Sequence, residues 1–451
     1  MSIATGIQPH LQPHPRYTAM RFANGSADQL ATLSAQYPVL GTMLDLVDIP
    51  SSTPQPDPKF APAIQTQMDR MRARTVEKLK AAGVQEEWIE HDPLGSLIVR
   101  IPGSAGLEDK QPLLLTAHMD IVAGDEHDPT RQVHPTLVND ADGNPWVATD
   151  GTTTLGADDK GGMSMILDNV ARILGHHPLQ QTPIAHAPLE IIFSPDEEST
   201  LESLKRLDTS KFKAKHVLVV DEFDAFKVTT GLASAVPINI NISGFPGGHS
   251  GDDIDKGRPN AIMALNNLLR KIGTGVIAMM PDNSMPIISK NIAMIKGGRA
   301  PNAIPENAQA DVFLRSGNKD MQDAELARMQ KLVDNAQRYY RGHGAPDARI
   351  DMQWHEEYPA WEGDPNTPIK DWAIAASKDM QGPNVEVGAV HAAAQASILA
   401  NMKNASGEPF DAVLIGPKIE GAHTVKERCN VNVLVEANRW LGGILQEYAK
   451  S

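Results

Sequence analysis

Five short apolar runs in this sequence lead directly into residues that can bind a metal ion. Each run has the length and composition of a buried strand. The residues that follow are aspartates, glutamates and histidines, and charged groups there cost free energy unless something pairs with them. Repetition at five places therefore predicts a metal centre. The residues are His118 with Asp120, Asp158, Glu197 with Glu198, Asp221, and His423.

The sequence His-Met-Asp at 118–120 places His118 and Asp120 on the same side of a strand, because side chains alternate between its two faces. An aspartate in that position can accept the second imidazole N–H and so orient the ring as a metal ligand. Taken alone, the pair is also typical of a simple hydrogen bond at a strand end.

The two acidic pairs allow different roles for neighbouring residues. Asp158 follows a glycine turn and precedes a helix, where an aspartate can cap the helix or bridge two metal ions. Glu197 and Glu198 point in different directions, so one can bind metal while the other acts on water as a general base. A solvated acidic loop is the alternative for this pair. Asp221 and His423 fit either a ligand or a structural role, but together these residues form the ligand set of a dimetal hydrolase.

The segments that position these residues alternate between strands and helices. We expect strands at 96–101, 113–118, 189–195 and 216–221, and helices at 62–83 and 163–174. This alternation is typical of an α/β fold in which helices pack on a mostly parallel sheet.

The pattern changes after Gly231 to the order β-α-β-β-α-β, which is typical of a ferredoxin-like α+β domain. We therefore expect a discontinuous catalytic domain of residues 1–233 and 361–451. The inserted domain is expected at residues 234–360. Two domains also suit a chain of 451 residues, because a single hydrophobic core stops growing below that length.

Composition excludes several classes of function. The net charge of −15 argues against a nucleic-acid partner, which requires a basic face. The sequence shows neither the apolar core of a signal peptide nor an apolar stretch of about 20 residues that could span a membrane. The single Cys429 fits a reducing compartment, so we expect a soluble, cytoplasmic protein. The polar segment 2–21 suggests no function.

The ordered motifs HMD, LGADDKGG, SPDEE, VVD and a late AH resemble the co-catalytic di-zinc exopeptidases. This family includes peptidase T, aminoacylhistidine dipeptidase, aminoacylase and succinyl-diaminopimelate desuccinylase. The resemblance runs from about residue 113 to 432. ATDGTTTLGADDK is similar to peptidase T, whereas GGHSGDDIDKGRPNAI and IGPKIEGAHTVKER are similar to aminoacylhistidine dipeptidase. Gln395 stands where the dipeptidases have a glutamate, which leaves substrate length and side-chain preference open.

The resemblance implies a role for each residue of the predicted metal centre. Two divalent metal ions are implied, with zinc expected and manganese or cobalt also suited to these ligands. The roles are Asp158 as the bridge, His118 and Asp221 at one metal, Glu198 and His423 at the other, Glu197 as general base and proton shuttle, and Asp120 as the partner of His118.

The resemblance also implies that the inserted domain is a lid and, in dimeric members, a homodimer surface. His249 matches the imidazole that stabilises the oxyanion, which in dimers comes from the neighbouring subunit. Asn302 and Arg315 match positions that hold a substrate carbonyl or carboxylate, and Arg258 is a further candidate because its fork suits a carboxylate.

We therefore expect a metallopeptidase that hydrolyses di- or tripeptides. An N-acyl-amino-acid amidohydrolase of the same family is the nearer alternative, because it shares every metal ligand. A non-catalytic peptide-binding protein is a more distant one. That alternative predicts a broken ligand set, whereas all five ligands and Glu197 are present.

Overall fold

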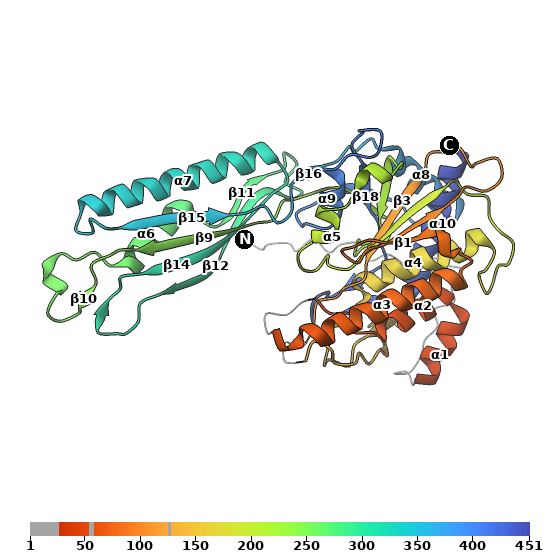
Figure 1. The fold of residues 1–451 in the computed structure, drawn as a ribbon, viewed down its shortest axis with the longest axis horizontal. Coiled ribbons are helices and arrows are strands. Elements are labelled where there is room, and N and C mark those ends of the chain that lie inside the picture. The colour runs from red at the N-terminus through yellow and green to blue at the C-terminus, as the bar shows by residue number, and fades with distance from the viewer. Residues whose placement is uncertain (1–26, 54–57, 125–127) are drawn as a thin grey trace. The chain divides into compact units, whose positions relative to one another are not determined.

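The computed structural model describes residues 27–53, 58–124 and 128–451, so segment 2–21 lies outside the described residues (Figure 1). The chain divides into two compact units, each described by itself. Unit 1 comprises residues 1–230, 363–388 and 402–451, and unit 2 comprises residues 231–362 and 389–401. The sequence-based domain boundaries of 234–360 did not include the second segment of unit 2.

A nine-stranded mixed sheet forms the centre of the α/β fold. Its order is β1-β2-β6-β3-β7-β18-β8-β16, with β17 also paired to β8. The four central strands β6, β3, β7 and β18 run parallel, and antiparallel strands flank them, which confirms the expected mostly parallel sheet. The strands are β1 (Ile89–His91), β2 (Leu97–Ile101), β3 (Leu113–His118), β6 (Leu189–Ser194), β7 (His216–Val219), β8 (Lys227–Leu232), β16 (Trp361–Glu362), β17 (Glu386–Val390) and β18 (Asp411–Leu414).

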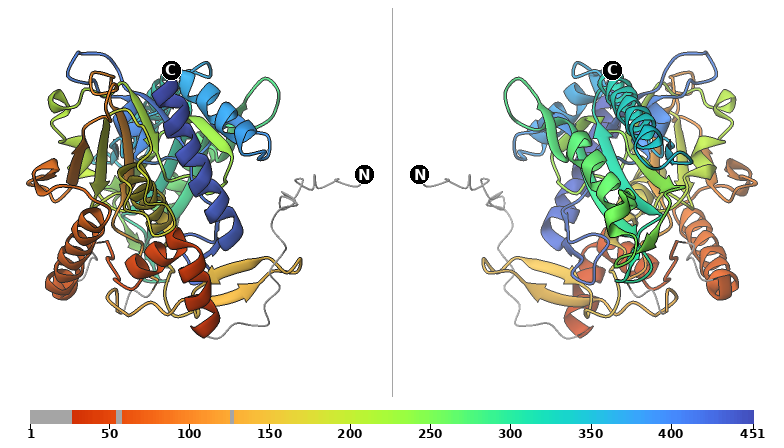
Figure 2. Two further views of the ribbon diagram at one scale, coloured as in Figure 1. Left: turned by 90° about the vertical axis from the view of Figure 1, so that its right-hand side faces the viewer. Right: turned by 90° about the vertical axis from the view of Figure 1, so that its left-hand side faces the viewer.

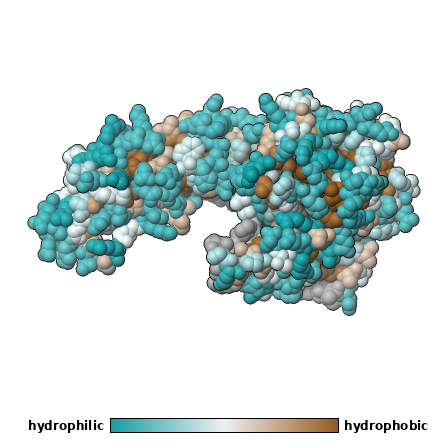
Figure 3. All heavy atoms as spheres, in the orientation of Figure 1, coloured by the Kyte–Doolittle hydropathy of each residue, from teal (hydrophilic) through white to brown (hydrophobic). Residues whose placement is uncertain are grey.

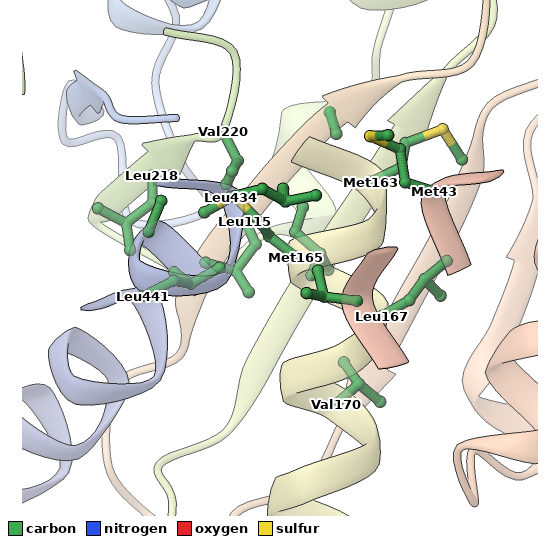
Figure 4. Close-up of a cluster of buried hydrophobic side chains, with 14 of the residues drawn as sticks. Met43, Leu115, Met163, Met165, Leu167, Val170, Leu218, Val220, Leu434 and Leu441 are labelled. Carbon is green, nitrogen blue, oxygen red and sulfur yellow. The ribbon is translucent and has the colours of Figure 1, made fainter. Parts of the chain in front are cut away.

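Helices of unit 1 share one apolar core with this sheet. Figure 4 shows Met165 of α4 beside Leu115 of β3 and Met163 of α4 beside Met43 of α2, with Leu434 and Leu441 of α10 in the same cluster. Burying a side chain of this size stabilises the fold by about 1.5–3 kcal/mol. The helices of this unit are α1 (Ala27–Gln36), α2 (Pro38–Val47), α3 (Ala61–Ala81), α4 (Ala157–Leu174), α5 (Glu202–Lys205), α8 (Pro368–Asp379) and α10 (Val431–Lys450).

A second, small sheet of unit 1 has the order β19-β20-β5-β4. It pairs the hairpin β4 (Thr136–Asn139) and β5 (Pro145–Ala148), gold in Figure 2, with β19 (Ile419–Glu420) and β20 (Arg428–Asn430). The loop between β19 and β20 contains His423, and Cys429 on β20 is fully buried. This sheet therefore joins segments from distant parts of the sequence at the loop that carries a predicted ligand.

Unit 2 contains the predicted β-α-β-β-α-β order, with one additional edge strand. Its antiparallel sheet has the order β11-β12-β14-β9-β15, and β11 was not expected from the sequence. Helices α6 and α7 cover one face and share a separate core with it. The elements are β9 (Val236–Ser243), β10 (Gly248–His249), α6 (Ala261–Ile272), β11 (Gly275–Met279), β12 (Pro286–Gly297), β13 (Ala303–Ile304), β14 (Ala308–Ser316), α7 (Lys319–Gly342), β15 (Arg349–Trp354) and α9 (Ala396–Ala400).

Among the described residues, no helix is both long and apolar enough to cross a membrane. The face shown in Figure 3 mixes hydrophilic and hydrophobic residues, with hydrophilic residues predominating.

Candidate metal centre

Three neighbouring parallel strands bring the first predicted ligands together. His118 is the last residue of β3, Glu197 and Glu198 follow the end of β6, and Asp221 follows the end of β7. Strands β6, β3 and β7 are adjacent in the sheet and parallel. The carboxyl ends of adjacent parallel strands meet at one edge, so the residues that follow them converge there.

Asp158 lies between two imidazoles at the beginning of α4. Its Oδ1 is 3.2 Å from Nε2 of His118, and its Oδ2 is 3.0 Å from Nε2 of His423. The backbone of Asp158 departs from helical geometry, with φ −82° and ψ 101°, and the peptide bond to Asp159 is cis. The two oxygens of one carboxylate therefore contact different histidines, one in the first third of the chain and one near its end.

Two further contacts complete the cluster. Nε2 of His118 is 3.7 Å from Oδ1 of Asp221, and Nε2 of His423 is 2.9 Å from Oε1 of Glu198. Within the described residues, the side chains form three groups of potential ligands, with the ligand atoms of each group within 4.8 Å of one another. The groups are His118, Asp158 and Asp221; His118, Glu197 and Glu198; and Asp158, Glu198 and His423.

Asp120 contacts both the histidine and the acidic loop. Nδ1 of His118 lies 2.9 Å from the main-chain oxygen of Asp120 and 3.4 Å from its Oδ1. Donation from Nδ1 leaves the lone pair of Nε2 directed at the cluster. The Asp120 carboxylate also accepts the main-chain N–H groups of Glu197 and Glu198, both at 3.0 Å. The sequence predicted the histidine contact but gave no indication of this second one.

The cluster contains more buried carboxylates than its two histidines can neutralise. Burial raises the pKa of Glu197 to about 8, and repulsion from Glu198 adds to this effect. Burial likewise raises the pKa of Glu198 and of Asp221. Hydrogen bonds to Asp158 and Glu198 raise the pKa of His423 to about 10. A divalent cation would neutralise this excess of buried negative charge, and imidazole and carboxylate are suitable donors for it.

Two neighbours of Asp158 also have buried polar contacts. The Asp159 carboxylate accepts N–H from His118 at 3.1 Å and from Gly162 at 3.2 Å. Nζ of Lys160 donates to the carbonyl of Ile49 at 2.6 Å, and burial lowers the pKa of this amine to about 7. Both side chains support the turn that presents the neighbouring carboxylate. In the sequence, the adjacent acids Asp158 and Asp159 followed by Lys160 were the only indication of this supporting role.

Glu427 is a buried residue of the site that sequence reasoning missed. One of its oxygens accepts the N–H of Gly156 at 2.8 Å, and the other accepts the N–H of Asp158 at 3.0 Å. Burial raises the pKa of Glu427 to about 7, with repulsion from Asp158 adding to the effect. Glu427 lies in a loop, four residues after His423, where no periodic pattern in the sequence indicates that a residue is buried or functional.

His249 and Asn302 lie side by side within unit 2. His249 on β10 pairs with Ala303 on β13, and the N–H of Ser250 donates to the carbonyl of Asn302 at 3.0 Å. Nδ1 of the exposed His249 accepts the N–H of Gly251 at 3.2 Å. In a neutral imidazole this acceptor role places the proton on Nε2, which is then a donor for a ligand.

Arg258 supports the loop that contains His249. Its Nη1 donates to the carbonyl of Gly247 at 3.0 Å, and its Nη2 is 3.1 Å from Oδ1 of Asp253. The other oxygen of Asp253 accepts the main-chain N–H of His249 at 2.8 Å. The guanidinium fork expected to bind substrate is therefore engaged in holding this turn.

Arg315 presents an unused donor. Its guanidinium lies over the ring of Phe313, 5.0 Å from the centroid, and burial lowers its pKa. Its Nη1 is buried without a hydrogen-bond partner among the described residues. Such a group is typical of a site that binds a ligand or water. Gln395, which departs from the dipeptidase motif, is fully buried at the beginning of α9.

Comparison with known proteins identifies the family. Residues 114–447 match Peptidase family M20/M25/M40, which is well over half of the chain. The chain belongs to this family. The matched segment begins on β3 and ends within α10, so it contains all of unit 2, the larger part of unit 1 and every residue of the cluster.

Individual relatives are about a quarter identical to this chain over the segments that align. It is 25% identical over 265 residues to the cytosol non-specific dipeptidase of Escherichia coli, covering 55% of this chain and 50% of that protein. It is 26% identical over 221 residues to peptidase T of Clostridium novyi, covering 49% of each. The matches therefore span about half the length of these curated relatives.

The fold is shared over a longer span. The crystal structure of the aminopeptidase PepT from Bacillus cereus superimposes with a TM-score of 0.72, covering 91% of this chain and 98% of that chain at 22% identity. At this identity the similarity establishes the family fold.

Proposed function

We propose that this protein is a two-metal peptidase that hydrolyses short peptides, most simply di- or tripeptides. The position of Asp158, with each carboxylate oxygen directed at a different histidine, is the observation that carries this proposal. The names of the dipeptidase and peptidase T relatives support the substrate class. The name of the cytosolic dipeptidase also supports a cytoplasmic location.

Asp158 is the proposed bridge between the two metal positions. His118 and Asp221 complete one position, and Glu198 and His423 complete the other, in line with two of the three ligand groups. Zinc is the expected metal because both donor types suit it, and manganese or cobalt fits the same donors.

Glu197 is the proposed general base. Divalent metal ions held by these ligands would supply Lewis-acid polarisation of the scissile carbonyl and would lower the pKa of water toward ~7. The Glu197 carboxylate takes a proton from the attacking water and delivers it to the leaving amine. In the metal-free protein, burial and repulsion from neighbouring carboxylates raise the pKa of Glu197 to about 8.

Unit 2 is proposed to act as the lid and to provide substrate contacts. Nε2–H of His249 donates to the oxyanion, Asn302 binds the substrate carbonyl, and the unpartnered Nη1 of Arg315 binds a terminal carboxylate. Arg258 acts through the turn it supports. We further propose a homodimer formed through unit 2, in which this imidazole serves the neighbouring subunit.

The test is Glu197→Gln in metal-reconstituted protein, assayed with dipeptides, tripeptides and N-acyl amino acids. Removal of the base should lower kcat by about 10²–10⁴-fold, while the bound metal content stays at the wild-type level. The exposed Glu202→Gln is the matched control and should retain full activity. Activity of Glu197→Gln within tenfold of wild type would overturn the assignment. Hydrolysis of N-acyl amino acids alone would establish a deacylase instead.

A further inference from the structure

Three buried carboxylates accompany the ligand groups without belonging to them. They are Asp120, Asp159 and Glu427, with exposed fractions of 0%, 1% and 1%. A buried carboxylate is costly unless its oxygens are hydrogen-bonded. In each of these residues, the oxygens accept main-chain N–H groups, and at least one donor lies in a different loop that carries a predicted ligand.

These contacts link four ligand-bearing loops in series. The loop of His423 reaches the loop of Asp158 through Glu427, and that loop reaches the end of β3 through Asp159. The end of β3 then reaches the acidic loop after β6 through Asp120. The bonds are Glu427 to Gly156 and Asp158, Asp159 to His118, and Asp120 to Glu197 and Glu198.

Glu427 makes the longest-range of these links. It joins residues 271 and 269 positions apart in the sequence and uses both oxygens on main-chain N–H groups of one turn. Its own N–H donates to the carbonyl of Thr424 at 3.1 Å, within the loop that holds His423 at φ 64°. The two ends of Glu427 therefore fix the backbone next to His423 and the backbone of Asp158 relative to each other.

The chemistry of the side chain matches this task. Two N–H donors on the same turn require two acceptor atoms at a fixed separation, which a carboxylate provides and a carboxamide does not. The charge also lies close to Asp158, an electrostatic cost that a neutral side chain would avoid. A residue needed only to fill the space would not require this charge.

We propose that Glu427 is a positioning residue that sets the placement of Asp158 relative to His423 before any metal binds. The inference rests on the proposed two-metal centre. Asp158 and His423 share only one of the two proposed metal positions, so loss of Glu427 should weaken that position more than the other. Partners behind metal ligands typically change metal affinity by about 10–100-fold.

The test is titration of the metal-free protein with Co²⁺. Calorimetry and the visible absorption of the bound ion are the two readouts. In Glu427→Gln we expect the first equivalent to bind as in wild type. The second should bind about 10–100-fold more weakly, with an altered absorption band. Glu420→Gln is the control from the neighbouring strand β19. Glu420 pairs with Arg428 at 2.6 Å, and both side chains are partly exposed at the surface.

Glu427→Asp separates placement from charge, because it keeps the carboxylate but shortens the reach by one carbon. It should show the same weakened second equivalent, and it decides the matter if Glu427→Gln does not fold. Unchanged binding with only a lower unfolding temperature would overturn the inference, as would wild-type binding by Glu427→Asp. Absence of Co²⁺ binding by the wild-type protein would instead overturn the proposed metal centre itself.

Discussion

At the scale of single residues, neighbouring acids in the same loop occupy different environments. Glu198 belongs both to the group with His118 and to the group with His423, where its Oε1 lies 2.9 Å from Nε2 of His423, whereas Glu197 belongs to the His118 group alone among the groups of the described residues. Both residues lie in the turn after β6, where successive side chains also point in different directions, so adjacent glutamates can take separate roles. Both residues are glutamates, so the different roles proposed for them depend on the directions in which their side chains point.

Removal of Glu198 should affect metal content rather than proton transfer. Glu198→Ala deletes a carboxylate from the group that contains Asp158 and His423, so the purified protein should lose one of its bound metal ions. Elemental analysis after dialysis measures this directly, with Glu197→Gln as the comparison that keeps its metal. Full metal content in Glu198→Ala would contradict its place as a ligand.

The sequence predicted the residues of the cluster better than the residues that hold them. His118, Asp221 and the two glutamates follow recognisable apolar runs, so their convergence could be expected from parallel strands. Glu427 binds main-chain N–H groups of a turn that is distant in sequence. Every residue except proline has such a group, so no residue pattern marks this contact in advance.

At the scale of elements, α4 is anchored in its second half, away from the proposed metal centre at its beginning. Asp168 accepts hydrogen bonds from Arg172 at 2.8 Å and from Asn438 of α10 at 2.7 Å, and it lies 3.0 Å from Nε2 of His177. Burial alone would raise the pKa of Asp168, but His177, Arg172 and Asn438 outweigh burial and lower it. The charged form of this carboxylate therefore stabilises the contact between α4 and α10.

Asp168→Asn should lower the free energy of unfolding by about 2 kcal/mol near pH 7, because the amide replaces one charged acceptor with a donor. The folded pKa lies below the unfolded value, so the stabilisation is present above about pH 4 and is lost as the pH falls through the folded pKa. The difference from wild type should therefore shrink toward about pH 3.

Urea unfolding at a series of pH values measures this difference. The exposed Asp379→Asn on α8 is the control and should leave stability nearly unchanged at every pH. A difference between Asp168→Asn and wild type that grows on acidification would contradict the interpretation.

The predicted elements are those with long periodic or apolar signals. The helix expected at 62–83 is α3 (Ala61–Ala81), and the four strands expected in the first half are present. The small sheet was not expected, because β19 and β20 contain two and three residues. Strands this short have too few residues for alternation to appear, and β20 pairs with a hairpin far earlier in the chain.

At the scale of the whole molecule, the two units have separate apolar cores. Leu265 of α6 is fully buried and belongs to the core of unit 2, whereas the helices around the metal centre share the core of unit 1. Each unit therefore has its own source of hydrophobic stabilisation.

Leu265→Ala should destabilise unit 2 by about 2–5 kcal/mol through lost burial and the resulting cavity. Co²⁺ affinity should remain at the wild-type value, because every proposed ligand belongs to unit 1. Chemical unfolding and Co²⁺ titration on the same sample provide the two measurements. Met263→Ala on the exposed side of α6 is the control, and a parallel loss of Co²⁺ binding would contradict the separation of the cores.

The insertion of unit 2 between Asp221 and His423 also imposes an order in time. During synthesis, His118, Asp158 and Asp221 leave the ribosome before unit 2, whereas His423 follows it. About 200 residues separate Asp221 from His423, and synthesis at about 5–20 residues per second makes this delay on the order of 10–40 s. A nascent chain thus holds the donors of one proposed metal position well before the other can be completed.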